Sequence, residues 1–140
     1  MKTLTLSAIA TIVLLLAACS KDDKHPLSAA SGSSTYDSLN TCAFNSGNPG
    51  TLFAFQINLE TAPTVTIGAI EFDLEWSNGD ESKDIYEDDF TINGSTVEFD
   101  WCFRFGSTDW FEVRPTILDE NDKTLSNTIK IRVNKPAGAN

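Results

Sequence analysis

Histidine is nearly absent from this chain, and that scarcity removes most familiar catalytic arrangements. The 140 residues include one histidine, His25, and no glycine-rich loop of the kind that cradles phosphate. A lone histidine provides no Ser-His or Cys-His pair for nucleophilic catalysis. Carboxylates are so plentiful that their pairing would fit any glycosidase and therefore singles out none. We expect a protein that is not an enzyme and that needs no cofactor.

Basic residues are also scarce. Lysine and arginine number 10 against 20 aspartates and glutamates, which gives a formal net charge of −10. Such a surface repels the phosphates of nucleic acids and anionic lipid head groups. We therefore expect no nucleic-acid partner, whereas an acidic balance by itself is poor evidence for a metal site.

No apolar run is long enough to span a membrane. The N-terminal run extends from Leu4 to Ala18, after the positive charge of Lys2, and a transmembrane helix needs about 20 apolar residues. A positive start, a short apolar stretch and small residues before Cys19 are the features of a secretory signal. We expect residues 1–18 to be a signal peptide.

Leu16-Ala17-Ala18-Cys19 resembles the lipobox of bacterial lipoproteins. The resemblance implies cleavage before Cys19 and membrane anchoring through lipid on its sulfur. Serine rather than aspartate follows Cys19, and this resembles the lipoprotein pattern for sorting to the outer membrane rather than retention in the inner membrane: the residue is Ser20. Lys21-Asp22-Asp23 resembles the signal with which Bacteroidota display lipoproteins on the cell surface. Two alternatives stay open: a secreted protein with a chance cysteine, and a charged spacer on a lipoprotein that faces the periplasm.

The rest of the chain divides into a tether, one domain and a tail. Residues 19–35 contain the lipid site and are rich in Ser, Ala, Lys and Asp, with almost no large apolar side chain. We expect a flexible tether, with His25 solvated in it, that holds the domain about 20–25 Å from the lipid. Residues 36–134 are the expected domain, and residues 135–140 the C-terminal tail.

From Tyr36 onward, apolar and polar side chains alternate in runs separated by turn residues, which is typical of β-strands. The alternation predicts seven strands, at residues 36–44, 52–59, 66–76, 90–92, 96–105, 110–118 and 129–133. Asn93-Gly94 predicts a tight hairpin centred on these two residues. No helical periodicity follows the signal, so we expect an all-β fold consisting of a single antiparallel seven-stranded β-sandwich.

The same alternation assigns side chains to faces. Trp76 and Trp101 fall on the inward face, whereas Trp110 points outward. The outward acidic side chains of residues 66–76 are expected to pair with basic side chains on neighbouring strands, each pair contributing up to about 1 kcal/mol. The acidic set is Glu71, Asp73 and Glu75, and the basic set is Arg114, Lys130 and Arg132.

The last two predicted strands resemble an immunoglobulin-like or fibronectin type III-like module. The resemblance lies in Phe111-Glu112-Val113-Arg114, followed through an Asp-rich turn by Ser126-Asn127-Thr128-Ile129-Lys130-Ile131, and in a core tryptophan at Trp76. It implies the sandwich architecture and no particular function, because such sandwiches serve many unrelated roles.

Two cysteines remain after Cys19, namely Cys42 and Cys102. In an oxidising compartment we expect one disulfide between them, with two buried free thiols as the alternative. An immunoglobulin domain bridges its second and sixth strands, whereas this bridge would join the first and fifth. Because a disulfide needs Cα atoms within about 7 Å, either Cys42 reaches across from a turn or the predicted strand order is wrong.

Two acidic segments are candidate cation sites. Asp119-Glu120-Asn121-Asp122 resembles a segment of cadherin linkers, and residues 80–89 place six carboxylates around Tyr86. Calcium takes about 6–8 oxygen ligands, but residues 80–89 lack the spacing and the glycine of an EF-hand. A solvated polar loop is the preferred interpretation of both segments, and we expect no metal.

These features predict a non-catalytic cell-surface lipoprotein, anchored by Cys19, that acts as a binding, adhesion or assembly module for an extracellular protein or glycan. The alternative is a carbohydrate-binding accessory lipoprotein of a glycan-uptake system. Strand counting places residues 119–122 at the tether end, and loops 47–50, 80–89 and 106–109 at the opposite tip. Tyr86 and Trp110 would lie there, and they are the candidate binding residues.

Overall fold

The computed structural model describes residues 24–44 and 47–139, and of residues 37–40 only the backbone. The predicted signal peptide, Cys19 and the export residues Ser20, Lys21, Asp22 and Asp23 lie outside the described residues. In the part of the chain that is described, no helix is long and apolar enough to cross a membrane.

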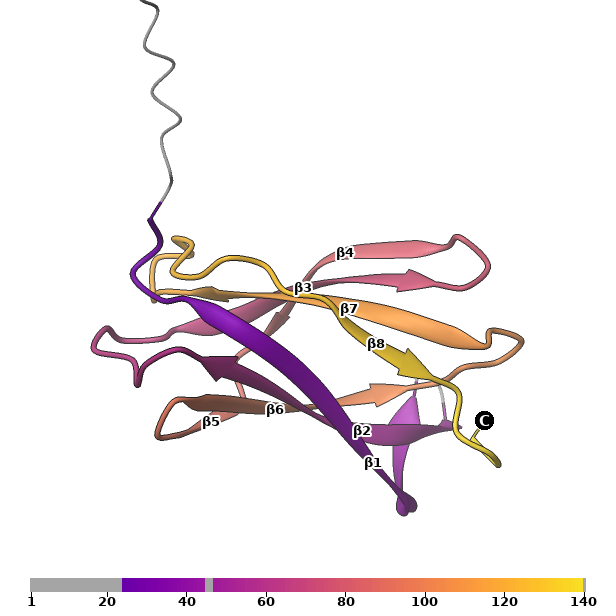
Figure 1. Cartoon of the computed structure of the whole chain (residues 1–140). Helices are drawn as coiled ribbons and strands as arrows, with labels where there is room; N and C mark the ends of the chain where they lie inside the picture. Colours follow the sequence, from indigo (N-terminus) through magenta and orange to yellow (C-terminus); the bar gives the residue numbers. More distant parts are fainter. Residues whose placement is uncertain (1–23, 45–46, 140) are drawn as a thin grey trace, which may run out of the picture.

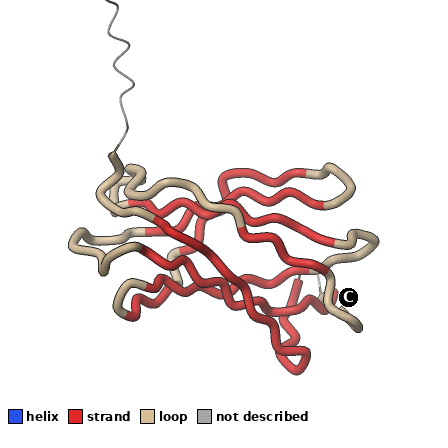
Figure 2. Tube along the Cα trace, in the orientation of Figure 1, coloured by secondary structure: helices blue, strands red, loops and turns tan. Residues whose placement is uncertain are grey.

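Eight strands form two antiparallel sheets that pack face to face, as Figure 1 shows, and strands and loops account for the whole described trace in Figure 2. The strands are β1 (Ala29–Phe44), β2 (Asn48–Leu59), β3 (Ala69–Trp76), β4 (Glu81–Glu87), β5 (Phe90–Asn93), β6 (Thr96–Phe103), β7 (Trp110–Leu118) and β8 (Ile131–Asn134). One sheet has the order β1-β2-β6-β5 and the other β4-β3-β7-β8. The predicted all-β sandwich is confirmed.

The additional strand, which the sequence did not predict, is β4. It lies in the acidic segment 80–89, where the sequence predicted a loop. β4 pairs with β3 through Glu71–Tyr86 and Phe72–Ile85, with an irregularity beside Asp84, whose φ is 55°. It is an edge strand, so most of its side chains face water and its carboxylates do not oppose pairing. Acidity therefore concealed a strand, and the predicted number of strands was wrong by one.

β1 begins at Ala29, inside the predicted tether. Leu27 is only 4% exposed, and the Asn127 side chain hydrogen-bonds both the amide and the carbonyl of Ala29, at 2.8 and 3.0 Å. A Cβ added to Gly32 would lie 2.6 Å from Ile131 Cδ1. The start of β1 thus packs through its backbone and small side chains, which leave no apolar pattern in the sequence.

The Asn-Gly hairpin is present, but its turn is shifted by one residue. Asn93 pairs with Thr96, so the central residues are Gly94 and Ser95. Of these two central residues, only Gly94 has a positive φ, 62°. A glycine at the first central position is the pattern of a type II′ turn rather than the type I′ turn that Asn-Gly suggested.

Phenylalanines from both sheets fill the core. Phe103 of β6 stacks on Phe111 of β7 with ring centroids 4.0 Å apart, and Phe53 of β2 meets Phe111 edge-on at 5.6 Å. The predicted inward faces of the second, third, fifth and sixth strands are buried, apart from the tryptophans. Trp76 and Trp101 lie on the inner faces but are only partly buried.

Cys42 and Cys102 form the predicted disulfide, with Cα atoms 5.9 Å apart. β1 and β6 lie on opposite sides of β2, where strands would ordinarily be about 9–10 Å apart. The end of β1 therefore bends across β2, at the point where Gly50 faces Cys42 in the register. A Cβ on Gly50 would lie 2.7 Å from the Cys102 sulfur, so only glycine fits beneath the bridge.

We predict that Gly50→Ala lowers the free energy of unfolding by about 1–3 kcal/mol, because the added methyl group has no space. The cost should fall in a Cys42→Ala/Cys102→Ala background, which itself loses about 4 kcal/mol. It should not vanish, because the Phe103 carbonyl oxygen also lies 2.9 Å from the added Cβ. Urea titration of the four proteins measures both effects, and an equal cost with and without the disulfide would contradict the crossing at Gly50.

Candidate functional site

One side of the sandwich is open because β5 covers only half of β6. Their pairing starts at Asn93–Thr96 and ends at Phe90–Phe99. The Asp89 amide then donates to Glu87 Oε1, at 2.8 Å, instead of continuing the ladder. Residues 100–103 of β6 consequently have β2 on one side and no strand on the other within the described part of the chain.

The backbone of this free end presents unused polar groups. The Leu59 amide donates to the Ser95 carbonyl at 2.8 Å, so the odd-numbered residues of β6 bond to β2 and the even-numbered ones face away, since bonding sides alternate along a strand. The Asp100 carbonyl and both backbone groups of Cys102 therefore face the open side. The pairing of β5 with β6 ends before them, and no other strand of the described chain pairs with this side of β6.

The space beside the free end is a groove of about 560 Å³ between β6, β3, β4 and the end of β1. Trp101 packs edge-on against Phe72 at 5.0 Å between ring centroids, and part of its surface lines the groove. The apolar lining consists mainly of Phe44, Leu74, Trp76, Ile85 and Trp101. We refer to this space as the β6 groove.

Carboxylates surround one end of the β6 groove. Glu87 and Asp100 line it and also line an adjoining hollow of about 280 Å³, together with Asp89 and Glu98. Glu98 accepts a hydrogen bond of 2.7 Å from Gln56 Nε2. No basic side chain is among the described residues that line either space. The groove therefore combines an aromatic part, free backbone groups and an acidic end.

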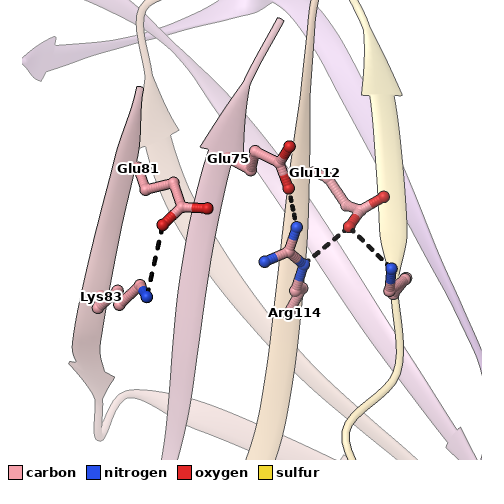
Figure 3. A network of polar contacts seen from close by, with 6 residues as sticks. Glu75, Glu81, Lys83, Glu112 and Arg114 are labelled. Atoms are coloured by element: carbon pink, nitrogen blue, oxygen red, sulfur yellow. Dashed lines mark hydrogen bonds and ion pairs between the residues drawn. The ribbon is translucent and has the colours of Figure 1, made fainter. Parts of the chain in front are cut away.

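The outer face of the β4-β3-β7-β8 sheet carries a set of ion pairs. Figure 3 shows Arg114 between Glu75 and Glu112. Lys130 Nζ lies 3.7 Å from Glu112 Oε1. Lys83 pairs with Glu81 along β4 at 3.4 Å. The expected cross-strand pairing is therefore present between Glu75 and Arg114. Lys130 instead pairs with Glu112, which is not one of the expected acidic partners, and Arg132 lies over the Trp110 ring, 3.8 Å from its centroid.

The two predicted binding residues are not brought together. Tyr86, 53% exposed, faces Glu71 near the start of β3, whereas the Trp110 carbonyl accepts from the Ser77 amide just beyond the end of β3. Six residues of strand span about 20 Å. They lie at opposite ends of the sheet because residues 80–89 run along it as β4 and do not form the expected loop at one tip.

Tyr86 belongs to an acidic patch with Glu71, Asp73 and Asp84. Burial raises the pKa of Glu71, and the Asp84 and Asp73 carboxylates raise it further. The Glu71 charge in turn raises the pKa of Tyr86. A hollow of about 310 Å³ beside the patch also includes His25, yet among the described residues no three His, Cys, Asp or Glu side chains are placed to hold a metal.

The second candidate cation segment, residues 119–122, is a self-contained turn. Asp119 Oδ1 accepts from the Lys123 and Asn121 amides at 2.9 and 2.8 Å, and these bonds hold the pKa of Asp119 below its ordinary value. The Leu27 amide donates to the Leu125 carbonyl at 2.9 Å. This turn therefore lies at the end where the described chain begins, as strand counting predicted.

The β6 groove was missed at the level of sequence, although one signal was available. The hairpin strands around Gly94 were predicted with unequal lengths, residues 90–92 against residues 96–105, which leaves part of the longer strand without a partner. Which side chains line the opening depends on β4, and that strand was not predicted. Glu87 and Ile85 could not be assigned without it.

The chain has no detectable relative in the comparisons: no protein-family model, curated protein or solved structure matches it.

The raised pKa of Glu71 gives a prediction with a defined sign. A carboxyl whose pKa is higher in the folded than in the unfolded state destabilises the fold once it ionises, so stability falls as the pH rises through the folded pKa. Glu71→Gln should therefore stabilise the protein at pH 7 by about a few tenths of a kcal/mol, because it removes a charge that is partly desolvated by burial and repelled by Asp84 and Asp73. The gain should disappear below about pH 3, where the carboxyl is protonated in both states.

Thermal unfolding of both proteins across this pH range measures the difference. Glu60→Gln, the same change at an exposed position, provides the baseline. A Glu71→Gln variant that is less stable than the parent at pH 7 would show that the carboxylate forms a favourable contact there.

Proposed function

We propose that this chain is a non-catalytic lipoprotein of the bacterial outer membrane, displayed on the cell surface, whose sandwich domain binds a partner outside the cell. The location is supported by the Leu-Ala-Ala-Cys19 lipobox and by Ser20 with Lys21-Asp22-Asp23. The binding role is supported by the β6 groove.

The domain type that we propose is immunoglobulin-like. An immunoglobulin constant domain pairs strands A, B, E and D in one sheet and C, F and G in the other. Taking β1, β2 and β3 as A, B and C, and β5 to β8 as D to G, the sheet orders agree, and β4 adds one strand beside C. The disulfide departs from that pattern, because it joins the first strand to β6 rather than one sheet to the other.

The observation that carries the binding role is the combination of free backbone groups and partly exposed tryptophans in one groove. Large apolar side chains that remain exposed to water favour association with another molecule, and so do the unpaired backbone N–H and C=O groups of a strand edge. Catalysis has no comparable support, because the described residues that line the groove include carboxylates but no histidine, lysine or cysteine thiol.

A carbohydrate-binding module is the second candidate. Trp76 and Trp101 line the same groove as Glu87 and Asp100, and aromatic faces beside carboxylates are a common way to hold a sugar ring and its hydroxyl groups. This placement supports the candidate better than the outward Trp110, which is covered by Arg132.

Photocrosslinking on intact cells tests the proposed function. We predict that a benzoylphenylalanine at Ser82, which lines the β6 groove, forms a covalent adduct with an extracellular molecule upon irradiation. The same group at Lys83, the exposed neighbour on β4, should form none. Cys19→Ala should abolish the adduct at position 82, because the protein would no longer be held at the surface.

The adduct is detected by its mass on the purified protein, and protease treatment of intact cells checks display. Equal adducts at positions 82 and 83 would show that the groove is not the binding site. An adduct that persists undiminished in Cys19→Ala would contradict the anchor.

A further inference from the structure

We propose that the β6 groove receives an extended basic segment of another protein, which adds to the sheet as a strand beside residues 100–103 of β6. The inference rests on the proposed binding function and specifies the chemistry of the partner. It follows from three properties of the groove: its backbone, its apolar wall and its charge.

The backbone groups on the open side of β6 are suited to pairing with another strand. The Asp100 carbonyl and the Cys102 amide and carbonyl face the open side in the order that an antiparallel neighbour needs. Residues 100–103 span about 13 Å, and β5 already occupies the same line along the first half of β6. A segment added here continues the line of β5 and forms main-chain hydrogen bonds, which is the general mode of strand addition to a free edge.

The walls of the groove favour an incoming segment in which apolar side chains alternate with others. A residue that faces Trp101 across the strand pair shares its direction and so points between the sheets, toward Trp76, Leu74 and Ile85. The next residue points outward beside the disulfide. Every second side chain of the incoming segment should therefore be apolar.

The charge selects a basic partner. Glu87, Asp89, Glu98 and Asp100 surround the end of the groove, no described lining residue is basic, and the whole chain has a formal charge of −10. Lysine or arginine at the outward positions of the segment, or beside them, can meet these carboxylates. A second copy of this chain would bring the same carboxylates face to face. A neutral glycan can donate hydrogen bonds from its hydroxyl groups to these carboxylates, but it has no positive charge to neutralise them.

The first test selects ligands without assuming a sequence. The protein is purified in detergent from cells that express the full chain, and it is used to select from a displayed library of random dodecapeptides. We expect enrichment of peptides in which apolar residues alternate with others and lysine or arginine is frequent. Enrichment of acidic or neutral peptides, or of none, would overturn the proposal.

Two modified peptides then separate the contributions. The best enriched peptide is synthesised with glutamate replacing its basic residues, and separately with N-methyl groups on the alternate backbone nitrogens that would face β6. We expect each change to weaken binding by about tenfold or more, through lost charge attraction and lost main-chain bonds respectively. Full affinity of the N-methylated peptide would exclude strand addition.

Matched protein variants locate the site. Glu87→Lys/Asp100→Lys should weaken peptide binding by about tenfold or more, whereas Glu60→Lys/Glu120→Lys changes the net charge equally at exposed positions outside the groove and should change it little. Both pairs avoid the core, and circular dichroism checks their folding. If the two double variants weakened binding equally, the attraction would depend only on the overall charge of the protein, and the proposal would be overturned.

The outcome for the partner is distinct from the outcome for the proposed function. If position 82 crosslinks on intact cells but the selection yields no basic peptide, the groove binds something else and the strand proposal fails alone. Binding of neutral oligosaccharides that is lost in Glu87→Lys/Asp100→Lys would assign the groove to glycans. If position 82 forms no adduct on intact cells, the proposed function itself fails.

Discussion

The length of β5 is the constraint on which the open side of this sandwich depends. The chain leaves β4 in one sheet at Glu87 and begins β5 in the other at Phe90, so two residues, Asp88 and Asp89, cross between the layers. β5 then pairs with β6 from Thr96 only as far as Phe99. In the part of the chain that is described, residues 100–103 of β6 lack a second neighbouring strand, and Trp101 and Trp76 stay partly in contact with water as a result.

The free end of β6 is nevertheless held in place from two directions. Phe103 stacks on Phe111 of the opposite sheet, and Cys102 is bonded to the end of β1 on the outer face. A strand edge fixed in this way loses little conformational freedom on binding, and such preorganisation strengthens association. The disulfide, which departs from the immunoglobulin pattern, therefore stabilises the part of β6 that has no hydrogen-bonded neighbour on its open side.

The parts of the fold that could be predicted are those with a large apolar residue at every second position. The inward faces of β2, β3, β6 and β7 follow directly from that period. The pairing of Cys42 with Cys102 was predicted on a different ground, because these two cysteines remain for a disulfide in an oxidising compartment. The start of β1 could not be predicted, because Gly32 packs under Ile131 with no side chain of its own. β4 could not be predicted either, because an edge strand can carry carboxylates at most of its positions.

The candidate site was less accessible to sequence reasoning than the fold. Tyr86 and Trp110 were assigned to one tip on the assumption that residues 80–89 are a loop, and a single missed strand separated them. Trp101 was assigned to the core by its parity, which is correct for its direction but not for its burial. Parity gives the face of a side chain, whereas exposure depends on which strands lie beside it.

Hydrogen exchange at the Cys102 amide tests the central claim most directly. Glu98 has the same parity on β6 but is paired with β5, and Trp101 bonds to β2. In the folded, disulfide-bonded protein, the Cys102 amide should exchange far faster than those of Glu98 and Trp101, because no described strand pairs with β6 on the side that this amide faces. Protection of the Cys102 amide equal to that of Glu98 and Trp101 would contradict a free edge at this end of β6.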